Sequence, residues 1–447
     1  MSTKRVLYVL NLSAEEFNNG LAEFIMDSPT SYHAAHNTGS LLAHAGFTQL
    51  SESSDFPAEP GGYFVIRDGA IIAWHIPANL DPAAGFQIVG AHTDSPSFKL
   101  KPNPSTAAYG WAQAGVEIYG GPLLNSWLDR ELRFAGRVHT VDGATHLVCT
   151  AAIARIPQLA IHLDREIGTN GLKLDRQKHT NPIWALTHPD GQSMFEQDLL
   201  QVIAEAVEYA ELNHEDITGY DILLADSQPP AHFGANGEFF ASGRLDNLSS
   251  TYTGLAALLN YAAEPRTGGQ IPVLASFDHE EIGSATRNGA AGPMLEEILE
   301  RILLANGTTG QAKHRALAAS WHLSADAGHV VHPNYAERHD PANHPRLNAG
   351  PLIKINANQR YATDGAGVAL VKSLASPAGV PVQEFVSNNS MPCGSTIGPI
   401  TATRLGIRTV DLGIGLLSMH SAREMCGTQD PLYLAKLLDA FFGSASH

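Results

Sequence analysis

Four short apolar runs along the chain each end in polar residues of the types that bind metals. Continuous apolar runs of this length predict strands of a sheet that is covered on both faces. The runs are residues 86–90, which lead into His92 and Asp94, 271–277, which lead into Glu280 and Glu281, 321–324, which lead into Asp326, and 409–417, which lead into His420.

Helical patterns fall between these runs. In residues 247–264 the apolar positions recur at helical spacing, residues 293–305 begin with a proline and end before Asn306-Gly307, and residues 430–442 form a third pattern near the C-terminus. Strands that alternate with helices predict an α/β fold with a mixed or parallel sheet sandwiched by helices. Because ligands bind beyond the carboxyl ends of such strands, the polar residues should meet at one edge.

The long segment between His92 and Asp246 contains no comparable polar cluster. It does contain strand-like alternation of apolar and polar residues at 131–138 and 146–153. A chain of 447 residues also exceeds what one hydrophobic core usually fills. We therefore predict an inserted β-rich domain at residues 96–235, and a main domain formed by residues 1–95 and 236–447.

Composition narrows the classes of function. The net charge of −17, without a run of Lys or Arg, argues against binding to nucleic acid or anionic membranes. No stretch approaches the roughly 20 apolar residues of a membrane span. The three scattered cysteines and the short apolar run after the N-terminus favour a cytoplasmic protein without a signal peptide. The low charged fraction, 16%, indicates either extensive burial or surface hidden in an assembly.

His92 and Asp94 lie two residues apart, so in an extended segment they point to the same face. His92 could bind a divalent metal while Asp94 accepts a hydrogen bond from the other ring nitrogen. The alternative for this pair is an ordinary turn at the end of a strand. Asp246 could bridge two metals with its two oxygens, although an aspartate before a helical pattern is often an N-cap.

Glu280 and Glu281 are adjacent carboxylates just past an apolar strand. Their repulsion is large unless cations or protons neutralise them, and small if they form a solvated acidic turn. In a metal site one of them would bind the ion and the other would act as general base. With Asp326 and His420 included, the set suits two divalent ions about 3.5–4 Å apart, such as Zn, Mn or Co.

Several of these segments resemble those of the aspartyl aminopeptidases, a branch of the dinuclear-metal exopeptidases. The resemblance covers nearly the whole chain, and no departure occurs at the positions that would bind metal or act as base. It rests on the segments Gly90-Ala91-His92-Thr93-Asp94-Ser95-Pro96, Ser276-Phe277-Asp278-His279-Glu280-Glu281-Ile282-Gly283-Ser284, Ser324-Ala325-Asp326, His332-Pro333-Asn334-Tyr335 and Met419-His420-Ser421-Ala422-Arg423-Glu424-Met425.

The resemblance implies a fold of the zinc-exopeptidase type, in which the insertion serves as a dimerisation domain. It implies that His92 and Glu281 are terminal ligands of different ions, that Asp246 bridges them, and that Asp326 and His420 complete the two sets. Asp94 would orient His92, and Glu280 would be the general base. The implied activity is hydrolysis that releases unblocked N-terminal Asp or Glu from peptides.

The resemblance further implies a homo-oligomer, a dodecamer built from dimers, in which His162 reaches a neighbouring subunit's active site. Lys354 would be the cation that pairs with the acidic side chain of the substrate. The histidine-rich stretch His329, His332, His339 and His344 has no compact ligand spacing. We expect it to form a loop that lines the substrate pocket, with His329 and His332 as contributors.

Two other functions remain open at this point. A dimetal deacylase of N-acylated amino acids would use a similar set of ligands. A catalytically inactive scaffold would be expected to have lost a ligand or the base, and the sequence lacks none of them.

Overall fold

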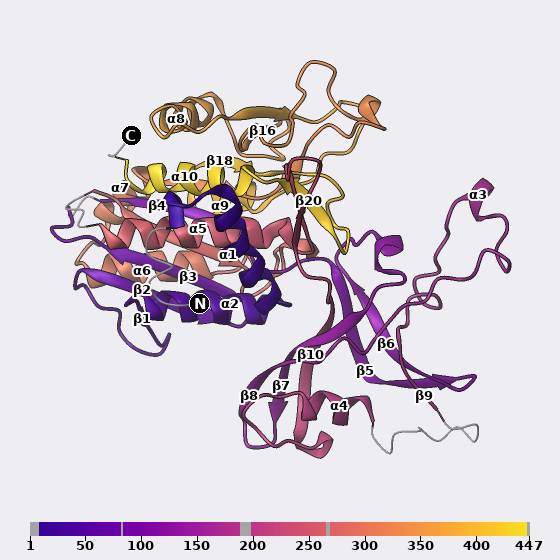
Figure 1. Ribbon diagram of the computed structural model, residues 1–447. Helices are drawn as coiled ribbons and strands as arrows, with labels where there is room; N and C mark the ends of the chain where they lie inside the picture. Colours follow the sequence, from indigo (N-terminus) through magenta and orange to yellow (C-terminus); the bar gives the residue numbers. More distant parts are fainter. Residues whose placement is uncertain (1–8, 82–83, 188–197, 265–268, 445–447) are drawn as a thin grey trace.

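The computed structural model describes residues 9–81, 84–187, 198–264 and 269–444. Within these residues nine strands form one mixed sheet in the order β1-β2-β3-β13-β4-β14-β18-β16-β17 (Figure 1). Their bounds are β1 Thr48–Gln49, β2 Gly61–Arg67, β3 Ala70–Ile76, β4 Phe86–His92, β13 Ile271–Phe277, β14 Trp321–Ala325, β16 Leu352–Ile355, β17 Gln383–Val386 and β18 Arg408–Gly413.

Strands β13, β4, β14 and β18 run parallel to one another in the centre of this sheet. Strand β3 on one side and strand β16 on the other run antiparallel to their central neighbours. Every residue of β4 and of β13 is buried, as expected for strands covered on both faces. The carboxyl ends of the four central strands therefore lie at the same edge of the sheet.

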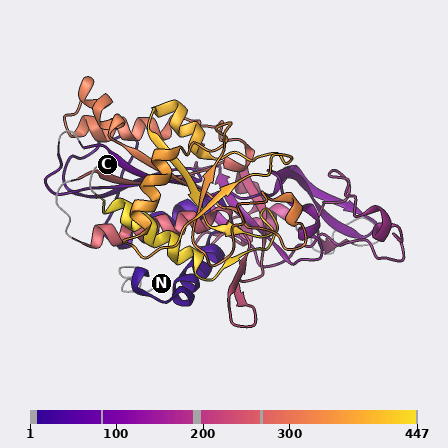
Figure 2. The ribbon, with the colours of Figure 1, turned by 90° about the horizontal axis from the view of Figure 1, so that it is seen from above.

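Helices cover both faces of the large sheet (Figure 2). Apolar residues of α1, α2, α5, α8 and α10 pack on one face, and those of α6, α7 and α9 pack on the other. The bounds are α1 Ala14–Asp27, α2 Ser31–His44, α5 Leu245–Ala263, α6 Met294–Ala305, α7 Gln311–Ala318, α8 Gly365–Ala375, α9 Ile397–Leu405 and α10 Asp430–Phe442. The predicted α/β sandwich is confirmed.

A second sheet of six strands projects away from the large sheet (Figure 1). Its order is β8-β7-β10-β5-β6-β9, and it has a core of its own. The elements of this part are β5 Ser97–Ala108, β6 Trp111–Tyr119, η3 Leu124–Trp127, β7 Leu132–Thr140, β8 Thr145–Cys149, α3 Ile167–Asn170, β9 Ile183–Leu186, α4 Leu199–Glu205, η4 His214–Asp216 and β10 Ile217–Asp226. All of them fall within the segment predicted as an insertion, whose domain limits and dimerising role stay predictions.

Arg137 joins the second sheet to the first. Arg137 of β7 donates to Asp68, in the β2–β3 turn, at 2.6 Å and to Asp221 of β10 at 2.9 Å. Its guanidinium also lies 4.3 Å from the centre of the Tyr32 ring at the start of α2. The guanidinium thus contacts both parts of the molecule, which ties the two sheets together.

Smaller elements complete the fold. Strands β11 (Ala231–Phe233), β12 (Phe239–Ser242) and β20 (Glu424–Gly427) form a three-stranded sheet, and β15 (Gly328–His329) pairs with β19 (Gly415–Leu416). The remaining helical turns are η2 Val9–Asn11, η5 Glu280–Ile282 and η6 Ala336–Arg338. Within the described ranges, no helix combines the length and the apolar character needed to cross a membrane.

The predicted elements agree closely with the observed ones in most places. Residues 271–277 form β13 and residues 430–442 form α10, with the predicted bounds. The run 409–417 is not one strand but two, β18 and β19. The chain passes so close to the main chain of Asp326 that a Cβ atom at Gly413 would lie 1.8 Å from its carbonyl oxygen. The second alternating segment, 146–153, is a strand only as far as Cys149.

Candidate metal centre

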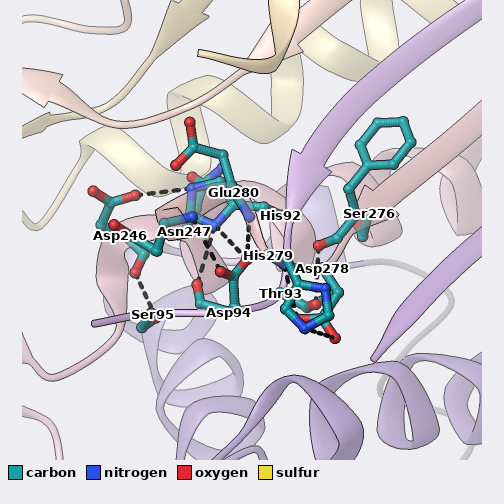
Figure 3. A network of polar contacts seen from close by, with 12 residues as sticks. His92, Thr93, Asp94, Ser95, Asp246, Asn247, Ser276, Asp278, His279 and Glu280 are labelled. Atoms are coloured by element: carbon teal, nitrogen blue, oxygen red, sulfur yellow. Dashed lines mark hydrogen bonds and ion pairs between the residues drawn. The ribbon is translucent and has the colours of Figure 1, made fainter. Parts of the chain in front are cut away.

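The five predicted ligands meet at the carboxyl edge of the central strands. Each comes from a different element, and the elements are far apart in the sequence. His92 ends β4, Asp246 lies in the first turn of α5, Glu281 lies in η5 just after β13, Asp326 directly follows β14, and His420 lies in the turn before β20. Figure 3 shows Asp94, Asp246 and Glu280 around His92.

The side chains of these residues form two sets that share Asp246. In the first set, Nε2 of His92 lies 3.3 Å from Oδ1 of Asp246 and 3.7 Å from Oδ1 of Asp326. In the second set, Nε2 of His420 lies 3.6 Å from Oδ2 of Asp246 and 3.4 Å from Oε2 of Glu281. In each set one ligand atom per residue lies within 4.8 Å of the others. Asp246 therefore turns one carboxylate oxygen towards each set.

The hydrogen bonds and the burial of these side chains argue against two alternatives that the sequence leaves open. No main-chain amide at the start of α5 donates to the Asp246 carboxylate, and Arg244 occupies the N-cap position. Asp246 is therefore not a helix cap. The side chain of Glu281 is only 4% exposed, so the adjacent glutamates do not form a solvated acidic turn.

The buried carboxylates of the cluster repel one another unless protons or cations neutralise them. Burial, followed by repulsion from Asp246, raises the pKa of Glu281 well above its ordinary value. Burial also raises the pKa of Glu280 to about 8, with His92 opposing the shift and Asp326, Asp246 and Asp94 adding to it. Oδ1 of Asp246 and Oε1 of Glu281 are buried and receive no hydrogen bond. A set of imidazole nitrogens and carboxylate oxygens with unsatisfied lone pairs fits the binding of divalent metal ions.

Asp94 contacts the His92 imidazole through both its main chain and its side chain. Nδ1 of His92 lies 3.0 Å from the main-chain oxygen of Asp94, whereas the Asp94 carboxylate is 3.5 Å away. That carboxylate also accepts hydrogen bonds from the main-chain amides of Glu280 and Glu281 at 3.0 and 3.1 Å. The hydroxyl of Tyr119 donates to it at 2.8 Å. Asp94 thus holds the imidazole through its main chain and the turn of the two glutamates through its side chain.

Three residues that sequence reasoning missed contact the predicted ligands or their neighbours. Tyr119, at the end of β6, orients Asp94, and the carbonyl oxygen of Gly121 lies 3.1 Å from Nδ1 of His420. Glu424 accepts hydrogen bonds from the main-chain amides of His420 and Asp246. Tyr119 and Gly121 lie within the predicted insertion, so no local spacing could have linked them to the centre. Glu424 belongs to one of the motifs but was given no role.

Lys354 and His329 lie beside the first set. Lys354 is 1% exposed, and its Nζ donates to the carbonyl oxygen of Ala327 at 2.6 Å and lies 3.7 Å from Oδ2 of Asp326. The His329 ring is exposed to solvent. Desolvation by the surrounding protein, and then the charge of Lys354, lowers its pKa.

The other candidate histidines lie apart from the two sets. His162 occupies an exposed turn before α3, and within the described residues no hydrogen bond or ion pair connects it to the centre. His339 Nε2 accepts a hydrogen bond from the main-chain amide of His332 at 3.0 Å, and the His332 ring packs against Tyr335. The histidine-rich stretch is therefore a hydrogen-bonded loop, and no metal-ligand group among the described residues includes its members.

Comparison with known proteins identifies the family. A family model described as aminopeptidase I zinc metalloprotease (M18) matches residues 24–442. A probable M18 family aminopeptidase 2 from Streptomyces coelicolor is 51% identical over 422 residues, which cover 94% of this chain and 96% of that protein.

Solved structures agree with this match. A structure of Ape4 in complex with Nbr1 is 38% identical, covers 95% of this chain and 85% of its own, and has a TM-score of 0.89. The mApe1 dodecamer from S. cerevisiae is 30% identical, covers 96% of both chains, and has a TM-score of 0.83. The resemblance read from the motifs is confirmed, and the chain belongs to the M18 family of metallo-aminopeptidases.

Proposed function

We propose that this aminopeptidase releases unblocked N-terminal Asp and Glu residues from peptides with the help of two divalent ions, preferably zinc, with Mn or Co as possible substitutes. The observation that carries the acidic specificity is the buried ammonium group of Lys354 beside the candidate ligand Asp326. The two sets of side chains that share Asp246 support the number of ions.

In this proposal His92, Asp246 and Asp326 hold one ion, and Asp246, Glu281 and His420 hold the other. Ions bound there would lower the pKa of a water molecule and polarise the scissile carbonyl. Glu280 is the general base because its carboxylate lies within 4.8 Å of ligand atoms of His92 and Glu281, yet it belongs to neither of the two sets that share Asp246. It takes a proton from water and delivers one to the leaving amine. The free α-amino group of the substrate binds at the centre, which restricts cleavage to the first residue.

A buried ammonium can select the charge of the substrate side chain. An ammonium has three donors, and Lys354 uses one of them on Ala327. Because the group is almost fully buried, its attraction for a carboxylate is weakly screened. His329 adjoins Lys354 and presents an exposed ring to the same region. The side chain of a substrate Asp or Glu would give the ammonium a further carboxylate partner besides Asp326, whereas a Leu side chain would give it none.

Activity on a panel of aminoacyl chromogenic substrates tests this specificity. The wild-type enzyme should prefer Asp and Glu to Leu and Ala. Lys354→Ala should reduce that preference by about 30-fold or more, because losing one partner of a buried charge pair costs about 2 kcal/mol or more. Metal content is measured in parallel, since Lys354 also neighbours Asp326.

Lys372→Ala is the matched control, because Lys372 lies on the exposed face of α8 and forms an ion pair with Glu384 of β17. It should leave the ratio of kcat/KM values for Asp and Leu unchanged. A wild-type enzyme that prefers Leu would rule out the acidic substrate class. An unchanged ratio of the kcat/KM values for Asp and Leu in Lys354→Ala would show that Lys354 does not recognise the substrate side chain.

We further propose a homododecamer built from dimers, with the insertion at residues 96–235 as the dimerising domain. His162 would enter the active site of the neighbouring subunit. Its turn carries Leu159, Ile161 and Leu163, which are 57%, 56% and 74% exposed. Adjacent exposed apolar side chains mark interaction surfaces. The related mApe1 from S. cerevisiae is described as a dodecamer.

Complementation between two inactive variants tests whether His162 acts in the partner's site. His162→Ala chains keep Glu280, and Glu280→Ala chains keep His162. After dissociation and remixing, about one site in four should be complete, because half of randomly paired dimers are mixed and each holds one intact site. Native mass spectrometry verifies the mixing. Mixed assemblies without recovered activity would show that His162 does not act across the interface.

The same proposal places the enzyme in the cytoplasm, which its free cysteines Cys149, Cys393 and Cys426 favour. Of the rival functions, a deacylase would need substrates with blocked N-termini. An enzyme that cleaves substrates with free N-termini but not those with blocked N-termini is therefore an aminopeptidase and not a deacylase. A scaffold without activity would be inert on the whole panel even with metal bound.

A further inference from the structure

Glu424 is a buried carboxylate for which the proposed reaction has no role. It is the first residue of β20 and is 2% exposed. Its Oε1 accepts a hydrogen bond from the main-chain amide of His420 at 2.7 Å, and its Oε2 accepts one from the amide of Asp246 at 3.0 Å. Both donors belong to residues of the set formed by Asp246, Glu281 and His420. One side chain therefore joins two candidate ligands that are far apart in the sequence.

The turn that carries His420 needs such support. Ser418 and His420 both have positive φ angles, 58° and 66°, which are uncommon for residues other than glycine. A backbone in this region persists only where its surroundings hold it. The Glu424 carboxylate binds the amide of His420 within this turn, and the carbonyl oxygen of Gly121 fixes the ring through Nδ1. Nε2 is then left facing Asp246 and Glu281.

The other set has different supports. His92 is held by the main chain of Asp94, and Asp94 is held by Tyr119 and by the amides of the two glutamates. Glu424 makes no hydrogen bond to His92 or Asp326 among the described contacts. A change at Glu424 should therefore reach the second set directly and the first only through the shared Asp246.

We propose that Glu424 is a positioning residue for one of the two ions: it fixes the separation of Asp246 and His420 and thereby sets the affinity of the Asp246–Glu281–His420 set. This inference rests on the proposed two-ion centre. Partners that orient metal ligands typically contribute about 10- to 100-fold to metal affinity. The two ions should thus respond unequally to the loss of Glu424.

Glu424→Gln tests the inference, because glutamine has nearly the same shape but turns an NH₂ group towards one of the two amides. Metal-free protein is titrated with Co²⁺, and binding is followed by calorimetry and by the visible absorption of the bound ion. We expect the ion of the Asp246–Glu281–His420 set to bind about 10- to 100-fold more weakly, and the other ion, which Glu424 reaches only through Asp246, to be weakened less. At limiting metal kcat should fall, and at excess metal it should recover, while KM for the peptide stays constant.

Asp430→Asn is the matched control. Asp430 is also a buried carboxylate, 1% exposed, and it accepts hydrogen bonds from the main-chain amides of Asn348 and Gly350. Its loss should lower thermal stability without changing either Co²⁺ affinity. If Asp430→Asn weakens the same ion, the effect of Glu424 is a general loss of stability and the inference is wrong.

A measurement on the wild-type protein covers the case in which Glu424→Gln does not fold. In the metal-free protein, hydrogen exchange of the Asp246 and His420 amides should be slow, because Glu424 holds them without help from an ion. Fast exchange at both amides would overturn the inference.

The outcomes for the inference and for the proposed function are distinct. A wild-type chain that binds fewer than two Co²⁺ ions contradicts the two-ion centre itself. If the wild-type chain binds two ions and the Glu424→Gln variant binds each of them as tightly as the wild type does, only the role of Glu424 is contradicted.

Discussion

Glu280→Gln should lower kcat by about 10²- to 10⁴-fold while the protein keeps its metal, since this is the usual contribution of a positioned general base. Glutamine preserves the shape of the side chain but cannot accept the proton of the attacking water. The main-chain amide of Glu280, which donates to Asp94, is unaffected by the substitution. Metal content by elemental analysis and kcat at saturating substrate are the two measurements.

The neighbouring residue supplies the contrast. Glu281→Gln should lose affinity for the ion of the Asp246–Glu281–His420 set, because one of its ligand oxygens becomes an amide. The two variants thus separate proton transfer from metal binding at adjacent positions. Near-normal activity in metal-loaded Glu280→Gln would end the assignment of Glu280 as the base.

The pH profile gives an independent check on Glu280. A general base works only when deprotonated, so wild-type kcat/KM should rise with pH through the pKa of Glu280. Burial and the neighbouring carboxylates raise that pKa to about 8 without cations. Two bound cations favour the ionised form and move the rise to lower pH. Glu280→Gln should lose this rise.

Asp246→Asn should have an effect of similar or greater size, because Asp246 contributes to both sets of ligands. Replacing the carboxylate removes the negative charge that both ions would share. The metal contributes several kcal/mol of transition-state stabilisation, so we expect activity to fall by about 10³-fold or more. Zinc content after dialysis should drop for both ions, which distinguishes this variant from Glu424→Gln.

Thermal unfolding with and without zinc provides a second readout for Asp246→Asn. Zinc should raise the Tm of the wild-type protein, since a ligand that binds only the folded state stabilises it. That increase should be nearly absent in Asp246→Asn. Asp226→Asn is the control, because Asp226 is a buried carboxylate that pairs with Arg130 and lies in neither set. It should retain the full increase, and a variant of Asp246 that also retains it would refute the bridging role.

Much of the fold could be predicted because its signals are local. The apolar run of β13 and the helical pattern of α10 have the predicted bounds. A strand buried on both faces leaves a continuous apolar run in the sequence, and a helix buried on one side leaves apolar residues at helical spacing. The expected single strand at 409–417 was wrong. The close approach of Gly413 to the main chain of Asp326 divides it, and that contact is between distant segments.

Local sequence patterns were enough to predict which side chains reach the edge of the sheet, because each predicted ligand follows an apolar strand or starts a helix. How these residues are grouped depends on tertiary packing. In the folded chain the predicted ligands form two sets that share Asp246, the carboxylate of Asp94 accepts hydrogen bonds from the amides of the two glutamates, and Lys354 is buried beside Asp326. The hydrogen bond between Glu424 and Asp246 joins residues 178 positions apart. Periodicity reports which face of an element is buried, but it carries no information about distances between elements, which arise only when the chain packs.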